Sequence, residues 1–189
     1  TTLVIRSDEW LSSVPLHLQL FASLGFRPPK YAHISPIMKN DNGNKRKLSK
    51  RKDPEAAVSY YREQGIPADA VKEYLLNIAN SSFENWRRAN PDKDIKEFDF
   101  QMNKMSVSGA LFDMVKLLDI SKNVISKYDA NKVYTESLKW AGSYDNELKD
   151  ILSNKEYSIK VLNIERGKAK PRRDISKWSD VKYLSLIHI

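Results

Sequence analysis

The pattern of hydrophobic and polar positions separates a first part of alternating elements from a long helical part. The apolar run at residues 2–6 predicts a buried strand, and residues 31–38 predict a second strand. Between them, apolar residues recur at helical spacing from Ser13, the expected N-cap, to Gly25, the expected stop. A strand, a helix and a strand in such a short stretch indicate a βαβ unit with parallel strands.

The segment after the second predicted strand is rich in turn-forming and basic residues. Residues 39–47 are expected to form a loop, with Asn42-Gly43 as its turn signal. Asp53 then has the character of an N-cap followed by Pro54, and this pair predicts a helix that stops at Gly65. The basic stretch NKRKLSKRKD, residues 44–53, therefore lies beyond the end of a strand, where ligands bind in α/β sheets.

Beyond Gly65 the apolar positions keep helical spacing almost to the end of the chain. Amphipathic segments are predicted at residues 106–118, 121–128, 130–141, 144–153 and 155–164. A polar stretch at 87–98 and a second basic loop at 165–174 interrupt this pattern. The expected fold is thus an α/β remnant followed by a mainly helical region, and it is predominantly α overall.

Composition narrows the possible classes of protein. Hydrophobic residues make up 41% and charged residues 30% of the 189, which suits a packed core beneath a solvated surface. The net charge of +8 favours an anionic partner such as nucleic acid, although basic proteins without one are common. Because there is no cysteine, disulfides and thiolate metal sites are excluded, and a reducing cytosol is the expected compartment.

Other classes of site are not indicated. His17, His33 and His188 are far apart along the chain, so we predict no metal site. No apolar run approaches the length of a membrane span.

The two ends have the character of cut ends. The first strand is entered at Leu3 with no preceding turn, and YLSLIHI at residues 183–189 follows a charged helical pattern without a stop. We expect the sequence to be a fragment whose last residues include non-native positions.

The basic stretch allows three interpretations on composition alone. It could be a solvated run of charge, a nuclear-localisation signal, or a loop that binds phosphate. In the third case Lys47 and Lys50 would neutralise a triphosphate, Ser49 would add a hydroxyl donor, and nearby backbone N–H groups would form an anion nest.

The order of the elements favours the phosphate interpretation. KLSKR, residues 47–51, resembles the KMSKS signature of class I aminoacyl-tRNA synthetases. Its flanks from residue 4 onward, together with KMSVSGALFDMVKL at 104–117, resemble glutamyl-tRNA synthetases, and the resemblance runs from residue 3 to about 180. The helical pattern from Tyr128 to Leu162 matches the bacterial-type glutamyl enzyme, since the glutaminyl enzyme has β-barrels there.

The resemblance implies roles for the signature residues. Lys50, Lys47 and Ser49 would be catalytic, and ATP, accompanied by Mg²⁺, would be bound by Lys47, Leu48, Ser49, Lys50 and Arg51. Arg51 stands where the signature ends in Ser, and Leu48 stands for its Met.

The first strand carries the expected amino-acid contact. Arg6 matches the family's glutamate-binding Arg, although an ion pair to Asp8 or Glu9 is the alternative. Ser7 replaces the usual Gly, which would hinder a backbone that needs a positive φ. Trp10 would pack near the adenosine or, alternatively, in the core.

The second basic loop is the expected tRNA contact, through Arg166, Lys168, Lys170, Arg172 and Arg173. Trp178 would stack on an unpaired base or anchor the core.

The resemblance also implies a domain order and a function. Residues 1–52 would end a Rossmann-type catalytic domain, 53–128 would contact the tRNA stem, and 129–189 would begin a helical anticodon-binding domain. The protein would be a cytoplasmic, monomeric glutamate–tRNA ligase acting on glutamate, ATP and tRNA, away from membranes. Because the HIGH motif is absent from the chain, we expect the fragment alone to be inactive.

Two other functions stay open on the sequence. One is a basic helical RNA-binding module without catalysis, and the other is a structural helical protein with a nuclear signal. The choice between tRNA-Glu alone and both tRNA-Glu and tRNA-Gln also stays open.

Overall fold

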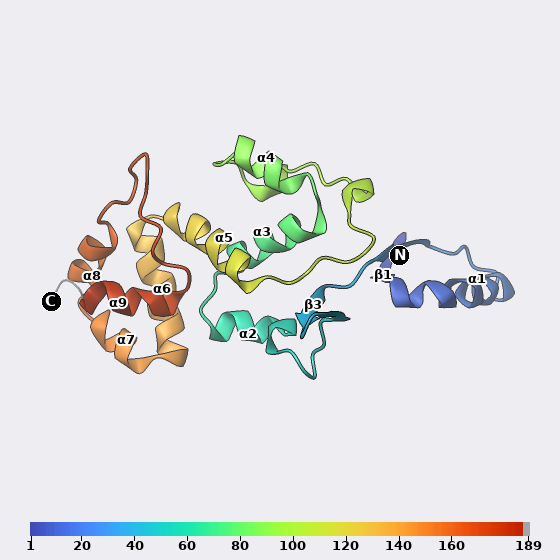
Figure 1. The fold of residues 1–189 in the computed structure, drawn as a ribbon, viewed down its shortest axis with the longest axis horizontal. Coiled ribbons are helices and arrows are strands. Elements are labelled where there is room, and N and C mark those ends of the chain that lie inside the picture. Colours follow the sequence, from blue (N-terminus) through green and yellow to red (C-terminus); the bar gives the residue numbers. More distant parts are fainter. Residues whose placement is uncertain (187–189) are drawn as a thin grey trace. The chain divides into compact units, whose positions relative to one another are not determined.

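Two compact units make up the computed structural model, which describes residues 1–186 (Figure 1). The first unit comprises Thr1–Leu48 and Asn77–Phe112, and the second comprises Ser49–Leu76 and the chain from Asp113 onward. Each unit therefore contains two separate stretches of sequence. His188 and the end of the segment expected to be non-native lie outside the described residues.

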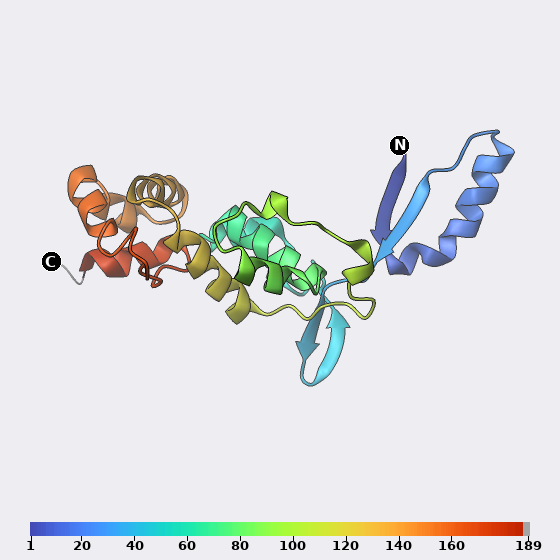
Figure 2. The ribbon, with the colours of Figure 1, turned by 90° about the horizontal axis from the view of Figure 1, so that it is seen from above.

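The βαβ unit predicted near the N-terminus is present in the first unit. Strands β1 (Leu3–Ser7) and β2 (Lys30–Ile34) pair in parallel, with Leu3 opposite Lys30 and Ser7 opposite Ile34 (Figure 2). The connection between them contains a 3-10 helix (Asp8–Ser13) and helix α1 (Val14–Ser23). Gly25 ends this connection's helix as predicted, since its φ of 70° is the left-handed conformation that glycine adopts without strain.

Ser13 stands at the N-cap position of α1, as predicted, but its side chain does not cap the helix. Its backbone is already helical, with φ −87° and ψ −10°, because the 3-10 helix leads directly into α1. An N-cap side chain needs an extended backbone to reach forward. The Ser13 hydroxyl instead donates backward to the Trp10 carbonyl at 2.8 Å.

The segment predicted as a loop at residues 39–47 is largely a β-hairpin, so that prediction was wrong. Strands β3 (Met38–Asp41) and β4 (Asn44–Lys47) pair antiparallel and form a separate two-stranded sheet. Asn42 and Gly43 connect them with φ values of 51° and 87°, the two positive angles of a type I′ turn. Strand β2 also ends at Ile34, before the predicted boundary.

The second stretch of the first unit contains short helices and extended chain. Helix α4 (Phe83–Ala89) is followed by 3-10 helices at Ile95–Glu97 and Met102–Lys104. The buried Phe83 ring packs edge-on against Phe98, with ring centroids 5.0 Å apart, and closes this stretch over a small aromatic core.

Helices dominate the second unit. Helix α2 (Val58–Glu63) follows a 3-10 helix at Pro54–Ala56, so the single helix predicted after Asp53 is interrupted at Ala57. Helix α3 (Ala68–Ala79) begins in this unit, and its last residues belong to the first unit. The later helices are α5 (Met114–Ser126), α6 (Ala130–Tyr144), α7 (Asn146–Ile151), α8 (Lys155–Leu162) and α9 (Val181–Leu186).

Helix α5 joins two segments that were predicted as separate helices. The predicted segment 106–118 is helical only from Met114 onward, because Asp113 caps the helix there. Its carboxylate accepts the N–H groups of Val115 and Lys116 at 2.9 and 3.1 Å. The helical spacing of residues 130–164 is confirmed by α6, α7 and α8.

The core of the second unit is built mainly from the later helices. Its fully buried members include Val133, Ala141, Leu148 and Val181. Trp178 belongs to the same core with 6% of its surface exposed, so the prediction that it stacks on a base was wrong and the alternative of a core anchor is confirmed.

The C-terminal end of α2 packs against that core at Gly65. The Trp178 N–H donates to the Gly65 carbonyl at 2.8 Å, and the Trp140 indole N–H donates to the Arg62 carbonyl at 3.0 Å. A β-carbon on Gly65 would lie 3.0 Å from the Trp140 ring, and its φ is 75°. Gly65 is therefore required both by conformation and by close approach.

The predicted fold class is confirmed, since two small sheets accompany a mainly helical chain. Among residues 1–186, no helix is both long and apolar enough to cross a membrane.

Candidate functional site

The basic stretch enters the site on strand β4. Asn44, Lys45, Arg46 and Lys47 form this strand, and Met38 of β3 lies opposite Lys47. The pairing continues one residue further, because the Leu48 N–H donates to the Ile37 carbonyl at 2.9 Å. The first Lys of the KLSKR segment is therefore held by a strand.

Lys47 has an anionic partner from the segment after β1. Its ammonium lies 2.5 Å from a carboxylate oxygen of Glu9, which precedes it by 38 residues. The Lys47 side chain is 48% exposed and the Glu9 side chain 53%. An exposed ion pair of this kind stabilises by only about 0–1 kcal/mol, so Lys47 can exchange Glu9 for a stronger anion at little cost.

A tight turn follows the strand. The Ser49 carbonyl accepts the N–H groups of Lys52 and Asp53 at 3.1 and 2.8 Å. The Ser49 N–H in turn donates to the Asp53 carboxylate at 2.9 Å. These bonds close the chain around three basic residues, Lys50, Arg51 and Lys52, all of which are exposed.

Three exposed cations, Lys50, Arg51 and Lys52, lie on one turn. Two ammonium groups and a guanidinium can each donate hydrogen bonds to phosphate oxygens, and they are not used in the core. Ser49 is half-buried beside them, and its hydroxyl is a further possible donor. The turn therefore fits a polyphosphate, while a group of three or more metal-ligating side chains is not found within the described part of the chain.

Arg6 lies at the end of β1, where its guanidinium stacks on a tryptophan. The guanidinium carbon is 3.9 Å from the centre of the Trp10 ring. A cation–π contact leaves the edge of the guanidinium able to donate hydrogen bonds. Trp10 is 46% exposed, so the core role weighed for it was wrong.

Ser7 is compatible with the backbone at the end of β1. Its φ of −66° and ψ of 151° are extended values that any residue adopts. The replacement of the usual Gly by Ser therefore introduces no backbone strain here.

The second basic loop has a structural residue at its base. The Arg166 guanidinium donates to the carbonyls of Leu162, Ile125 and Tyr128 at 2.6, 2.9 and 3.2 Å. Burial lowers the pKa of this guanidinium from its ordinary value. Arg166 is thus bound to the ends of α8 and α5.

The other cations of this loop differ in their exposure and in their ion pairs. Lys168 and Lys170 are exposed, and Lys168 lies 3.8 Å from Glu165. Arg172 is paired with Asp174, and Arg173 lies 3.4 Å from Asp119. The two lysines are the more available to a phosphate backbone.

Comparison with known proteins identifies the family. Residues 1–119 match the family described as tRNA synthetases class I (E and Q), catalytic domain. The chain belongs to this family of class I tRNA synthetases. The resemblance of the chain to class I tRNA synthetases is thereby confirmed.

This class I synthetase chain is similar in sequence to several glutamate–tRNA ligases. It is 56% identical over 183 residues to a glutamate–tRNA ligase of Clostridium perfringens strain 13, covering 96% of this chain and 34% of the relative. It is 50% identical over 197 residues to a glutamate–tRNA ligase of Sorangium cellulosum, again covering 96% and 34%. The chain therefore spans about a third of the length of the curated relatives it matches.

A solved structure supports the fold of the synthetase chain. A glutamate tRNA ligase from Elizabethkingia meningosepticum, crystallised in complex with its amino acid, superposes with a TM-score of 0.70 at 23% identity. The match covers 96% of this chain and 36% of that structure.

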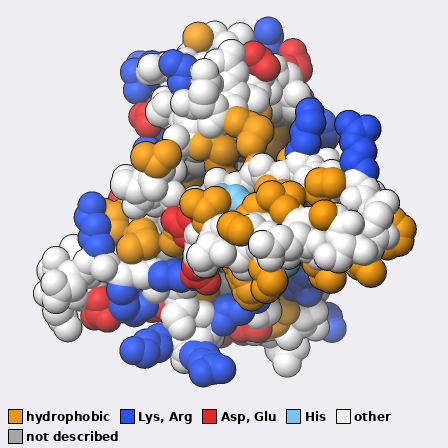
Figure 3. Space-filling model, turned by 90° about the vertical axis from the view of Figure 1, so that its right-hand side faces the viewer, with side chains coloured by type: hydrophobic (Ala, Val, Ile, Leu, Met, Phe, Trp, Pro, Cys, Tyr) orange, Lys and Arg blue, Asp and Glu red, His pale blue; other side chains and the backbone are white. Residues whose placement is uncertain are grey.

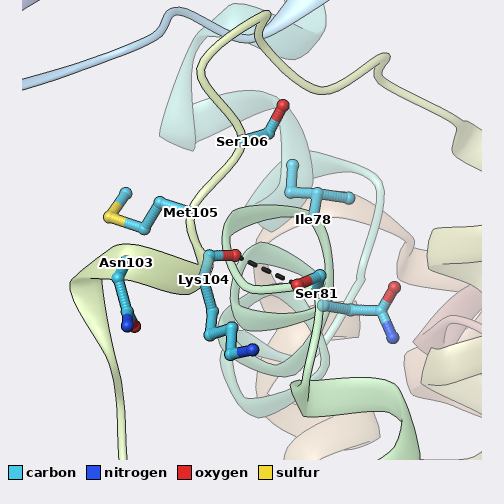
Figure 4. A pocket seen from close by; sticks show the side chains of 7 residues that line it. Ile78, Ser81, Asn103, Lys104, Met105 and Ser106 are labelled. Atoms are coloured by element: carbon cyan, nitrogen blue, oxygen red, sulfur yellow. Dashed lines mark hydrogen bonds between the residues drawn. The ribbon is translucent and has the colours of Figure 1, made fainter.

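The synthetase chain also has a small hollow in its first unit. It encloses about 240 Å³ between the end of α3 and residues 103–106 (Figure 4). At its wall the Ser81 hydroxyl donates to the Lys104 carbonyl at 3.2 Å. The predicted site residues do not contribute to its lining, so we assign it no role in the reaction.

Sequence reasoning missed the contacts that two acidic residues make with the KLSKR segment. Glu9 was weighed only as a partner of Arg6, whereas it contacts Lys47. Asp53 was predicted to cap the following helix, whereas its carboxylate bonds backward to Ser49. The available signal was the Asp53-Pro54 pair. It indicates that the Asp53 side chain accepts a backbone N–H, but not whether that N–H lies before or after Asp53 in the chain.

Proposed function

We propose that this chain is part of a glutamate–tRNA ligase and that its KLSKR segment binds the phosphates of ATP during formation of glutamyl-adenylate. The observation that carries the proposal is the exposed turn of Lys50, Arg51 and Lys52, closed by the Ser49–Asp53 hydrogen bonds. The names of the relatives support the choice of glutamate.

In this function the Lys50 ammonium follows the pyrophosphate as its negative charge increases in the transition state. Lys47 leaves Glu9 to join it, and Ser49 donates its hydroxyl to the same oxygens. Leu48 anchors the segment through its bond to the Ile37 carbonyl, while Arg51 adds a planar donor. Mg²⁺ would arrive with the nucleotide and supply further charge stabilisation when bound.

Arg6 has the proposed role of holding the substrate glutamate. A guanidinium can bind a carboxylate through two parallel hydrogen bonds, and the Trp10 ring would keep that guanidinium in a fixed plane.

The test is Lys50→Ala in a full-length ligase that contains this sequence. Loss of one charged transition-state contact costs roughly 3 kcal/mol, so adenylation should slow about a hundredfold, with glutamate binding nearly unchanged. Lys45→Ala is the matched control, because Lys45 is an exposed lysine of β4 that lies outside the signature. An unchanged adenylation rate in Lys50→Ala would refute the role given to Lys50.

We also propose that the chain alone does not catalyse adenylation. The face of α1 supports this proposal, since its ten residues, all described, include none that is buried. Leu16 is 66% exposed, and hydrophobic side chains gather on the face that Figure 3 shows, which is the side of α1 in Figure 1. Glutamate-dependent pyrophosphate exchange by the 189-residue chain would overturn this point.

The proposed second substrate is tRNA. Residues 53–128 would contact the stem and residues 129–189 the anticodon side, boundaries that stay a prediction, as do the monomeric state and the cytoplasmic location. Lys168, Lys170, Arg172 and Arg173 would track phosphates, while Arg166 holds the base of their loop.

Salt dependence tests the RNA contact. Replacing Arg172 and Arg173 together with Ala should reduce the slope of log affinity against log salt by about one to two units if both touch phosphate. Filter binding with tRNA over a series of salt concentrations measures this slope. An unchanged slope would show that neither arginine contacts phosphate.

The alternative function is a basic RNA-binding module without catalysis, favoured by the same exposed lysines of the second basic loop. The two functions differ at Lys50. Binding of ATP that is lost in Lys50→Ala supports the ligase, while tRNA binding with no effect of ATP supports the module.

A further inference from the structure

A buried carboxylate lies directly behind the exposed cations of the signature segment. Asp53 has only 2% of its surface exposed, although it follows two exposed basic residues, Arg51 and Lys52. It is not one of the five signature positions, 47–51. A charged group is rarely buried unless it is hydrogen-bonded, so its position needs a reason.

Asp53 binds both polar groups of the Ser49 backbone. Its carboxylate accepts the Ser49 N–H at 2.9 Å, and its own N–H donates to the Ser49 carbonyl at 2.8 Å. The two bonds close a ring of chain from Ser49 to Asp53 with Lys50 inside it. The backbone on the N-terminal side of Lys50 is thus fixed by a side chain on its C-terminal side.

The same carboxylate also offsets part of the positive charge of the turn. Lys50, Arg51 and Lys52 are consecutive cations that repel one another. A negative charge buried at the end of their turn offsets part of that repulsion and favours the closed turn over an extended chain.

We propose that Asp53 is a positioning residue of the signature: its carboxylate fixes the Ser49 backbone so that the Lys50 ammonium is held toward the phosphates. Asp53 does not touch the substrate and acts through Ser49 and Lys50. The part of the inference that concerns phosphates rests on the proposed function, while the part that concerns the turn does not. Displacement of a reacting group by about 1 Å can reduce a rate about a hundredfold, so a fixed backbone matters here.

The first experiment measures the turn itself in the 189-residue chain. Exchange of the Ser49 amide proton, followed by NMR, should be about tenfold faster or more in Asp53→Ala, because the charged acceptor is lost. Asp53→Asn should lie between, since an amide oxygen can still accept this bond.

The matched control is Asp145→Ala. The Asp145 carboxylate accepts the Leu148 N–H at 3.0 Å, so the same kind of bond is removed at a distant helix start. This variant should leave the exchange of the Ser49 amide unchanged. Equal Ser49 exchange in Asp53→Ala and in the unchanged chain would overturn the inference.

The second experiment measures the reaction. The chain replaces the matching 183 residues of the Clostridium perfringens relative, and pyrophosphate exchange is followed with glutamate, ATP and tRNA present. Asp53→Ala should lower kcat by about 10- to 100-fold with the KM for glutamate within about twofold. In Lys50→Ala, adding Asp53→Ala should cause little further loss, because Asp53 acts through Lys50.

The outcomes separate the two proposals. If the unsubstituted hybrid enzyme does not exchange pyrophosphate, the proposed function fails, and Ser49 exchange still decides the structural role of Asp53. If the losses in Asp53→Ala and Lys50→Ala multiply in the double variant, the positioning role is overturned. Should Asp53→Ala fail to fold, Asp53→Asn carries both measurements, with a smaller effect expected in each.

Discussion

Replacing Arg166 with Ala tests whether this arginine is part of the fold or part of an RNA surface. Its guanidinium donates to three backbone carbonyls, those of Leu162, Ile125 and Tyr128. These carbonyls lie at or just beyond the C-terminal ends of α8 and α5, where helices leave their last carbonyls short of intrahelical donors, although the Ile125 carbonyl also accepts the Tyr128 N–H at 3.1 Å. Alanine would leave all three without this donor.

The size of the effect follows from the number and kind of these bonds. A hydrogen bond to a charged group contributes about 1.5–3 kcal/mol, and three bonds from one half-buried guanidinium do not add fully. We therefore expect Arg166→Ala to lower the free energy of unfolding by about 3 kcal/mol. For a chain of this size that corresponds to a fall in Tm of about 6–12 °C. Arg166→Lys should lose nearly as much, because one ammonium cannot replace the fork of donors.

The assay is urea unfolding followed by tryptophan fluorescence. Trp140 and Trp178 lie in the second unit and report on the part of the fold that contains Arg166. Lys168→Ala is the matched control, since Lys168 is an exposed cation two residues away. Its stability should change by less than about 0.5 kcal/mol.

The opposite pattern of results would refute this reasoning. In that case Arg166→Ala would leave the free energy of unfolding unchanged. It would instead reduce the affinity for tRNA and the dependence of that affinity on salt. Such a result would show that the three carbonyl contacts contribute nothing and that the guanidinium serves phosphate.

Three further predictions concern the second unit. Gly65→Ala should lower the free energy of unfolding by about 1–3 kcal/mol in urea titrations, because φ is 75° and the added carbon would lie 3.0 Å from Trp140; full stability would contradict the packing described. Burial raises the pKa of Tyr61 to about 12, so the unfolded chain ionises first and stability should fall between about pH 10 and pH 12; Tyr61→Phe should lessen that fall when unfolding is compared at pH 9 and pH 11. The buried Ser121 hydroxyl donates to the Ser176 carbonyl at 2.6 Å, and Ser121→Ala should cost about 1 kcal/mol, whereas no loss would indicate that the bond is not formed.

Much of the fold was predictable because its signals are local. The parallel pair β1 and β2 follows from two apolar runs separated by a helical pattern, and the Gly25 stop follows from a conformation that favours glycine. The KLSKR segment was found for the same reason, since it is a short run in a recognisable order.

The hairpin was missed because its strands carry no hydrophobic signal. Strand β4 is Asn44–Lys47, four polar residues, so the period-two pattern that marks a half-buried strand is absent. Its pairing with β3 is made by backbone hydrogen bonds across the Asn42-Gly43 turn. The turn signal was recognised, but nothing in the flanking side chains indicated that the two strands would pair.

The contacts of the candidate site were the least predictable part. Glu9 and Lys47 are 38 residues apart, and no local pattern relates them. Asp53 is a residue type that accepts backbone N–H groups, yet the sequence does not indicate whether it accepts from the chain before or after it. The first contact joins segments that are distant in sequence, and the second runs from a side chain back to the preceding turn. Hydrophobic periodicity carries no information about either kind of contact.

The interleaving of the two units determines when each can fold during synthesis. Ser49–Leu76 leaves the ribosome well before Asp113, yet both belong to the second unit. At a synthesis rate of ~5–20 residues per second, the earlier stretch waits seconds for its partner, with its apolar side chains unsatisfied. Asn77–Phe112 emerges during that wait and can join Thr1–Leu48, so these two stretches can assemble while the second unit is half made. The segment that carries Ser49, Lys50 and Arg51 therefore belongs to the unit that is assembled later.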